Sequence, residues 1–177
     1  NPHLPELYDL CDEMGFLVWQ DFAFACGAYP EYEAYRANVE AEARQAIRRL
    51  RNHPSLALWC GNNECEMDLP VDAAWKGKEL FHGLINGIVR ELDPGRIYWP
   101  SSPYGGEKGW SSEEGDYHGE PWFKALQHGM ERWHEFFDGD MGLFMSEFPT
   151  QGPPEVESLR RFIPEKVLTR SLARSAN

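Results

Sequence analysis

The sequence predicts an α/β fold in which parallel strands alternate with helices. Short apolar runs, each bounded by turn residues, are typical of strands buried on both faces, as in a parallel sheet. Longer segments with apolar residues at helical spacing separate these runs. Strands that alternate with helices of more than ten residues indicate βα units. We therefore expect one domain over residues 1–177, with no linker.

The first half of the chain carries two helices and two strands in this order. The apolar spacing over 4–14 predicts a helix, which Gly15 can end. A buried strand is expected near 16–20. A long amphipathic helix over 31–51 then leads to a second strand at 56–60.

The second half continues the alternation and ends in a helix. The expected elements are a helix over 73–92, a strand near 96–100, a loop rich in glycine and serine over 101–115, a strand near 115–118, a helix over 122–137, a strand near 142–146 and a helix beyond Glu157. Five strands are therefore expected, all of them parallel.

Charge and hydropathy limit the partners of the chain. The formal net charge is −12, and an acidic surface repels phosphate backbones, so we expect no nucleic-acid partner. No apolar stretch approaches the roughly 18 residues of a membrane span, so we expect no membrane partner. The sequence contains neither Gly-x-Gly-x-x-Gly nor a Walker-type loop, which argues against a nucleotide. It opens at Asn1 without an initiator methionine, so it predicts no compartment.

The four cysteines do not predict a metal centre. Cys11, Cys26, Cys60 and Cys65 lack the spacing of a zinc site. We expect them to be buried free thiols, and we expect neither a metal nor a cofactor.

Polar side chains follow the predicted strands, and two of them are glutamates. The groups are Gln20 and Asp21, then Asn62, Asn63 and Glu64, then Ser101 and Ser102, then Asp116 and His118, then Ser146 and Glu147. The loops after parallel strands converge on one face of an α/β fold. Two carboxylates on such a face, Glu64 and Glu147, are the minimum equipment for cleaving a glycosidic bond. The high aromatic content, 14%, suits sugar-binding platforms, although burial alone accounts for much of it.

Three sequence elements stand in the order found in one enzyme family. They are Tyr8-Asp9-Leu10-Cys11-Asp12-Glu13-Met14-Gly15 with Val18-Trp19-Gln20-Asp21-Phe22, then Arg51-Asn52-His53-Pro54-Ser55-Leu56-Ala57-Leu58-Trp59-Cys60-Gly61-Asn62-Asn63-Glu64, then Met145-Ser146-Glu147-Phe148. Together they resemble the β-mannosidase branch of glycoside hydrolase family 2. The resemblance covers nearly the whole chain, and its most specific part is the Trp-Cys-Gly-Asn-Asn-Glu run.

The resemblance implies a (β/α)8 TIM-type barrel of which only part is present. The five expected strands correspond to the third through seventh of the barrel. The first, second and eighth strands, and the flanking β-sandwich domains of the family, are expected to be missing from this fragment. Because the sheet would then keep two open edges, we expect self-association through them and poor activity of the chain alone.

The resemblance also implies roles for individual residues. Glu64 is expected to be the general acid/base and Glu147 the nucleophile of a retaining exo-glycosidase that removes terminal β-D-mannose from oligosaccharides. Asn63 is expected to bond the sugar 2-hydroxyl, and a structural asparagine of the loop is the alternative. The further residues expected at the substrate are Trp19, Asp21, Asp116 and His118. For Trp19 the alternative is a residue that fills the barrel, and for Asp116 with His118 it is a loop-capping pair.

Two other functions remain open from the sequence. One is another family 2 specificity, of the β-galactosidase, β-glucuronidase or exo-glucosaminidase type. The other is a catalytically idle carbohydrate-binding barrel fragment, against which the presence of both Glu64 and Glu147 argues.

Overall fold

Helices and strands alternate along the chain, as the sequence predicts. The computed structural model describes residues 3–67, 69, 73–105, 114–140, 142–147, 154–164 and 167. In order, the elements are α1 (Pro5–Met14), β1 (Val18–Asp21), α2 (Glu33–Leu50), β2 (Leu56–Cys60), η1 (Glu79–Ile85), α3 (Asn86–Leu92), β3 (Ile97–Trp99), β4 (Tyr117–His118), α4 (Glu120–His128), η2 (Met130–Arg132), α5 (Trp133–Asp138), β5 (Met145–Glu147) and α6 (Val156–Leu159).

The five predicted strands are present, and every strand pair is parallel. They form a three-stranded sheet in the order β1-β2-β3 and a two-stranded sheet of β4 and β5. Between the two sheets the chain makes an antiparallel bridge from Tyr104 to Asp116. The α/β class with parallel strands is therefore confirmed, but the strands divide into two sheets because the chain turns back on itself between β3 and β4.

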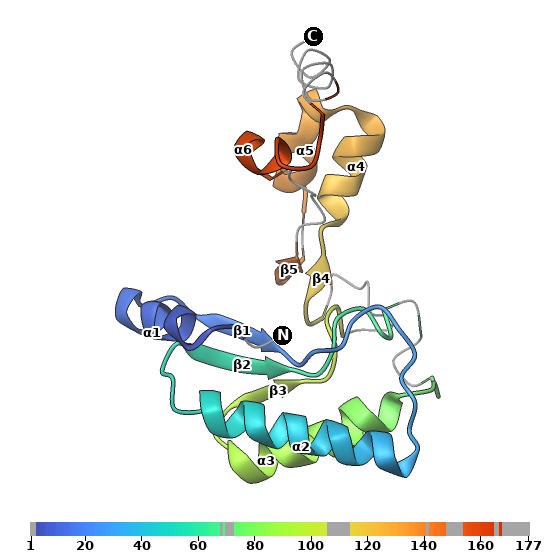
Figure 1. Cartoon of the computed structure of the whole chain (residues 1–177). Helices are drawn as coiled ribbons and strands as arrows, with labels where there is room; N and C mark the ends of the chain where they lie inside the picture. The colour runs from blue at the N-terminus through green and yellow to red at the C-terminus, as the bar shows by residue number, and fades with distance from the viewer. Residues whose placement is uncertain are drawn as a thin grey trace.

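The hydrophobic core lies on one face of the β1-β2-β3 sheet. Figure 1 shows α2 and α3 lying along that face, and no described helix covers the opposite face. Trp59 of β2, Ile47 of α2 and Phe81 of η1 are fully buried in this core. The opposite face keeps Leu17 and Ile97 exposed, at 80% and 62%. Among the described residues, no helix has the length and apolarity to cross a bilayer.

Two predicted helices are shorter than the sequence pattern suggests. The segment expected over 73–92 becomes helical only near Glu79, because Gly77 has a φ of +107° that a helix does not accept. The segment expected over 122–137 divides at Gly129, whose φ is +116°. In both cases the apolar spacing continues across a backbone turn, which a periodicity argument does not detect. The short α6 lies at Glu157, and most of the segment in which a closing helix is expected lies outside the described residues.

The expectation that all four cysteines are buried is wrong. All four are free thiols, but only Cys60 is buried, at the end of β2. Cys11 and Cys65 are half-buried, and Cys26 is exposed in the loop after β1. Cys26 lies beside polar residues, among them Glu64, rather than in an apolar core.

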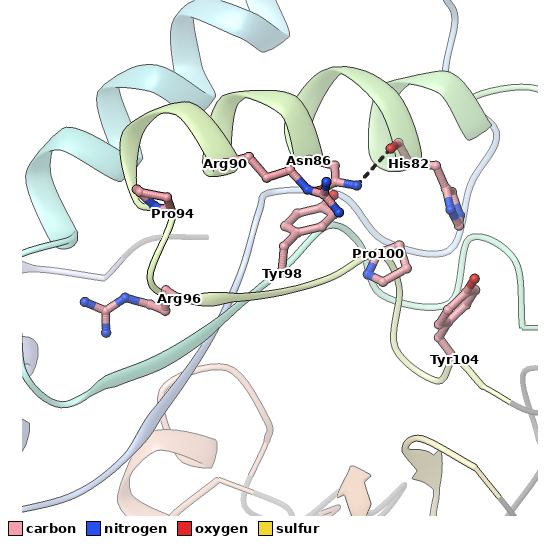
Figure 2. A pocket seen from close by; sticks show the side chains of 8 residues that line it. All are labelled: His82, Asn86, Arg90, Pro94, Arg96, Tyr98, Pro100 and Tyr104. Carbon is pink, nitrogen blue, oxygen red and sulfur yellow. Dashed lines mark hydrogen bonds between the residues drawn. The ribbon is translucent and has the colours of Figure 1, made fainter.

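A hollow of about 590 Å³ opens beside α3 (Figure 2). His82 and Asn86 line it from the helical side, and Tyr98 and Pro100 line it from β3 and the residue that follows. Burial raises the pKa of the Tyr98 hydroxyl well above its usual range, and this hydroxyl donates to the Phe81 carbonyl at 2.7 Å. Neither predicted catalytic glutamate lines this hollow.

Gly61 and Gly87 give opposite predictions for the same substitution. A Cβ at Gly61 would lie 2.3 Å from the Tyr98 hydroxyl and 2.4 Å from the Pro100 carbonyl oxygen. Gly61→Ala should therefore reduce the free energy of unfolding by about 1–3 kcal/mol, as overpacking does. A Cβ at Gly87, inside the continuous helix of η1 and α3, meets nothing within 4 Å.

Gly87→Ala should raise the free energy of unfolding by about 0.5–1 kcal/mol, because glycine is the poorer helix former. Urea unfolding of both variants measures the difference. A free energy of unfolding for Gly61→Ala that is as high as that for Gly87→Ala would show that the structure around Gly61 accommodates the added Cβ without strain.

Candidate active site

Backbone bridges continue the β1-β2-β3 sheet past the ends of its strands. They join the loop after β2 to the loop after β1 on one side and to the start of the loop after β3 on the other. Asn63 makes parallel bridges to Ala25 on one side and to Ser102 on the other. The Asn63 amide nitrogen donates to the Phe24 carbonyl at 2.9 Å, and the Ser102 amide nitrogen donates to the Asn62 carbonyl at 2.9 Å. These bridges extend the parallel order past the strand ends and hold Glu64 at a fixed place.

Glu64 has an unusual backbone and two side-chain partners. Its φ is +60°, in the left-handed region, and its amide donates to the Ser102 carbonyl at 2.7 Å. Oε1 lies 3.0 Å from Nδ1 of His118, and Oε2 accepts a hydrogen bond from the Cys26 thiol at 3.1 Å. The side chain remains 23% exposed, so both of its oxygens are oriented while the group stays open to a ligand.

Glu147 enters the same place from β5. Its Cα pairs with that of His118 across β4 and β5, and its carbonyl accepts from the Gly119 amide at 2.8 Å. Oε2 of Glu147 lies 3.7 Å from Nε2 of His118, and the side chain is 47% exposed. One oxygen of Glu64, one oxygen of Glu147 and one ring nitrogen of His118 all lie within 4.8 Å of one another. Phe148, which follows in the sequence motif, lies outside the described residues.

Asp116 is buried, and four donors surround its carboxylate. Oδ1 accepts from Trp99 Nε1 at 2.6 Å and from the Tyr104 amide at 3.1 Å. Oδ2 accepts from the hydroxyls of Ser102 at 2.6 Å and Ser146 at 2.5 Å. His118 is also buried, with only 1% of the residue exposed. Both residues lie at the predicted site, but the side chain of Asp116 is occupied by protein donors.

The adjacent asparagines differ in burial and in side-chain contacts. Asn62 is fully buried, and its side chain bonds the Pro100 carbonyl, the Cys65 amide and the Ser101 hydroxyl at 2.8–3.0 Å. It therefore fixes the loop. Asn63 uses its backbone for the bridges described above, so its half-exposed side chain can turn to a ligand.

An aromatic wall stands beside the polar cluster. Trp19 and Phe144 stack with ring centroids 5.8 Å apart. Both line an apolar hollow of about 400 Å³ on the uncovered face of the β1-β2-β3 sheet, together with Trp99 and Asp116. Asp21 accepts from Trp19 Nε1 at 2.9 Å, and burial raises the pKa of the Asp21 carboxyl. Asp21 thus supports the indole from behind.

Three side chains at the site had no role in the sequence analysis. Ser102 and Ser146 appeared there only as polar residues after strands, and Cys26 appeared only as a thiol. For the serines, the position after a strand was the available signal. Cys26 follows β1 by five residues, and no local pattern points its thiol toward Glu64.

The described residues contain two groups of side chains with the spacing of metal ligands. One is Glu64, His118 and Glu147, and the other is Asp9, Asp12 and His53 at the surface. In the first group, the Glu64 and His118 atoms bond each other at 3.0 Å. In the second, Asp12 already bonds both His53 and the Ser55 amide. Each geometry is therefore accounted for by contacts within the protein.

Comparisons with known proteins identify relatives of the chain. No family model matches it. β-Mannosidase B of Thermothelomyces thermophilus is 35% identical over 174 residues, covering 89% of this chain and 20% of the relative. The Aspergillus fumigatus β-mannosidase B is 35% identical over 173 residues, with 88% and 20% covered. The chain thus spans about a fifth of the length of these curated relatives.

A solved structure gives the same result. The crystal structure of a β-D-mannosidase from Dictyoglomus thermophilum matches with a TM-score of 0.75 and 40% sequence identity. The match covers 93% of this chain and 20% of that chain. These relatives are glycoside hydrolases. Within that class, the chain is a homologue of the β-mannosidase branch of glycoside hydrolase family 2, and the predicted resemblance is confirmed.

The contact between Cys26 and Glu64 predicts the alkylation behaviour of the thiol. The hydrogen bond to Glu64 is the main reason why the pKa of Cys26 is raised above its ordinary 9.0, with burial and the Glu64 charge acting in the same direction. Because the thiolate is the nucleophile, alkylation by iodoacetamide should reach its half-maximal rate above pH 9. Glu64→Gln removes the charge, so it should move this midpoint to lower pH.

Peptide mass spectrometry over a pH series measures the alkylation rate. Buried Cys60 serves as the internal reference that should stay unreactive in the folded protein. The same midpoint in both proteins would argue that the thiol and the carboxylate are not in contact.

Proposed function

We propose that this chain provides the two catalytic carboxylates of a retaining β-mannosidase. The observation that carries the proposal is the meeting of Glu64 and Glu147 at the ends of parallel strands, with carboxylate oxygens within 4.8 Å of each other. Retaining glycosidases hold their carboxyl groups about 5–5.5 Å apart, and inverting enzymes about 6.5–9.5 Å. The short separation favours the retaining mechanism.

The proposed fold is part of a (β/α)8 barrel, with β1 to β5 as its third through seventh strands. The parallel order, the helices on one sheet face and the polar carboxyl ends of the strands support it. On this proposal, the uncovered apolar face of the β1-β2-β3 sheet is the side that faces the barrel interior.

In the proposed reaction, Glu147 attacks the anomeric carbon of a terminal β-mannoside. Glu64 protonates the departing oxygen, which leaves a covalent glycosyl ester on Glu147. Glu64, now ionised, takes a proton from water as the water attacks the same carbon and releases mannose. The greater exposure of Glu147, 47% against 23%, suits the group that must reach the sugar carbon.

The remaining predicted substrate residues divide into two kinds. Asn63, whose half-exposed side chain lies next to Glu64 in the sequence, is proposed to bond the 2-hydroxyl, and the stacked Trp19 and Phe144 offer an apolar wall to the sugar. Asp21 and Asp116 accept hydrogen bonds from the indole nitrogens of Trp19 and Trp99. We propose that they orient these indoles rather than contact the sugar.

Another family 2 specificity is the main alternative. Rates on nitrophenyl β-mannoside, β-galactoside, β-glucoside, β-glucuronide and β-glucosaminide separate the candidates. The longest natural polypeptide that contains this sequence is the appropriate protein for this comparison and for the two experiments below. Binding of mannosides without turnover would favour the idle carbohydrate-binding alternative.

Covalent trapping tests the proposed function and the nucleophile together. A 2-deoxy-2-fluoro-β-D-mannosyl fluoride should inactivate the enzyme with time and leave one fluoromannosyl group on Glu147, because the fluorine slows hydrolysis of the ester. Peptide mapping locates the label, and Glu147→Gln should take up none. A label on any other residue would overturn the assignment.

Glu64→Ala tests the general acid/base. Turnover of substrates with poor leaving groups should fall by about 10²- to 10⁴-fold, whereas activated aryl mannosides should lose far less, because they need little protonation. Azide should restore turnover of the activated substrates and yield β-mannosyl azide, since the missing side chain admits a small anion. Equal losses for all leaving groups, with no response to azide, would contradict the role. Gly87→Ala, distant in the helix, is the control that should keep wild-type kinetics.

A further inference from the structure

A hydrogen-bond relay behind the two glutamates fixes where the protons of the site reside. It runs from Asp116 through Ser102 to His118 and ends at Glu64. The distances are 2.6 Å from Ser102 Oγ to Asp116 Oδ2, 3.0 Å from Ser102 Oγ to His118 Nε2, and 3.0 Å from His118 Nδ1 to Glu64 Oε1. Asp116, Ser102 and His118 are at most 4% exposed, so the relay lies in the interior.

The donors around Asp116 determine the direction of the relay. A carboxylate only accepts hydrogen bonds, and a serine hydroxyl has a single proton. Ser102 and Ser146 both lie within 2.6 Å of Asp116 Oδ2, so each gives its proton to Asp116. Ser102 Oγ can then only accept from His118, which places a proton on Nε2.

The remaining ring nitrogen then requires a proton between itself and Glu64. With Nε2 protonated, neutral His118 presents a lone pair at Nδ1, and a carboxylate oxygen 3.0 Å away would present another. Two acceptors at this distance repel each other, so one proton must lie between them. The Cys26 thiol donates to the other oxygen, Oε2, so Oε1 is the glutamate oxygen that meets this proton.

We propose that Asp116 and Ser102 are positioning residues that hold His118 in the Nε2–H form and thereby keep on Glu64 the proton that it delivers to the departing oxygen. The inference rests on the proposed function. When Glu64 gives up its proton, the leaving group takes it, and the Nδ1 lone pair then faces a bare carboxylate. That contact favours recapture of a proton from the attacking water, so one arrangement serves both steps.

Asp116→Asn reverses the relay without changing the shape of the side chain. Trp99 Nε1 and the Tyr104 amide both donate to Oδ1, so the new carboxamide must keep its oxygen there. Its NH2 group then replaces Oδ2 and donates to the serines. Ser102 is free to donate to Nε2, and His118 becomes the Nδ1–H form, which stabilises ionised Glu64.

Histidine-selective ¹⁵N NMR reads the protonated ring nitrogen directly. Comparison with His118→Gln assigns His118 among the 6 histidines. The wild-type protein should carry the proton on Nε2, whereas Asp116→Asn and Ser102→Ala should carry it on Nδ1. In Ser102→Ala the reason is that Nε2–H loses its Ser102 acceptor, while the Glu147 oxygen at 3.7 Å lies beyond hydrogen-bond distance. Ser55→Ala, which removes a buried hydroxyl that is not part of the relay, should match the wild type.

Kinetics provide the second measurement. Both relay variants should lower kcat for alkyl mannosides by about 10- to 100-fold with little change in KM, and 2,4-dinitrophenyl mannoside should be nearly unaffected. Among the described residues, the titratable groups around the relay are Glu64 and Glu147 beside the His118 ring, Asp116 behind Ser102, and Cys26 beside Glu64, so the kinetics of both variants are compared with those of Glu64→Gln over a pH series.

The outcomes separate the relay from the proposed function. An Nδ1–H form or a doubly protonated ring in the wild type, or the same form in wild type and Asp116→Asn, overturns the relay even if mannosides are hydrolysed. Equal kcat losses for alkyl and dinitrophenyl substrates would overturn the link between the relay and the acid proton. If the longest natural polypeptide that contains this sequence cleaves no glycoside, the proposed function is refuted, while the tautomer measurement still reports on the relay.

Discussion

The buried carboxylate of Asp116 is the contact on which the geometry of the site depends. A carboxylate inside a protein is costly unless donors surround it, and here the donors come from different parts of the chain. Trp99 belongs to β3, Tyr104 and Ser102 to the loop that follows, and Ser146 to β5. The carboxylate therefore joins elements that regular strand pairing leaves in two separate sheets.

The order of helices and strands could be predicted because each depends on local residue patterns. Leu56-Ala57-Leu58-Trp59-Cys60 is an apolar run of strand length, and the structure makes all five residues β2. The helix boundaries were less predictable. Gly77 and Gly129 interrupt segments whose apolar spacing continues past them, and a glycine is tolerated often enough in helices that its presence alone does not predict a break.

The meeting of Glu64, His118 and Glu147 could be predicted from topology, since the carboxyl ends of parallel strands share one edge. The contacts made by the neighbouring side chains could not be predicted in this way. Asn62 and Asn63 are chemically identical, and only the loop path shows that the first is buried and bonded while the second remains available. The contact of Cys26 with Glu64 likewise depends on the backbone of Cys26 itself, which is left-handed with a φ of +49°.

The backbone of Glu64 has a consequence for how such a site persists. At a φ of +60°, a residue with a Cβ costs roughly 1–2 kcal/mol relative to ordinary conformations, and glycine or asparagine would occupy the position with less strain. A glutamate at this position therefore lowers the stability of the loop. If Glu64 has the proposed catalytic role, selection for a more heat-resistant protein alone would tend to replace it and so remove the chemistry together with the strain.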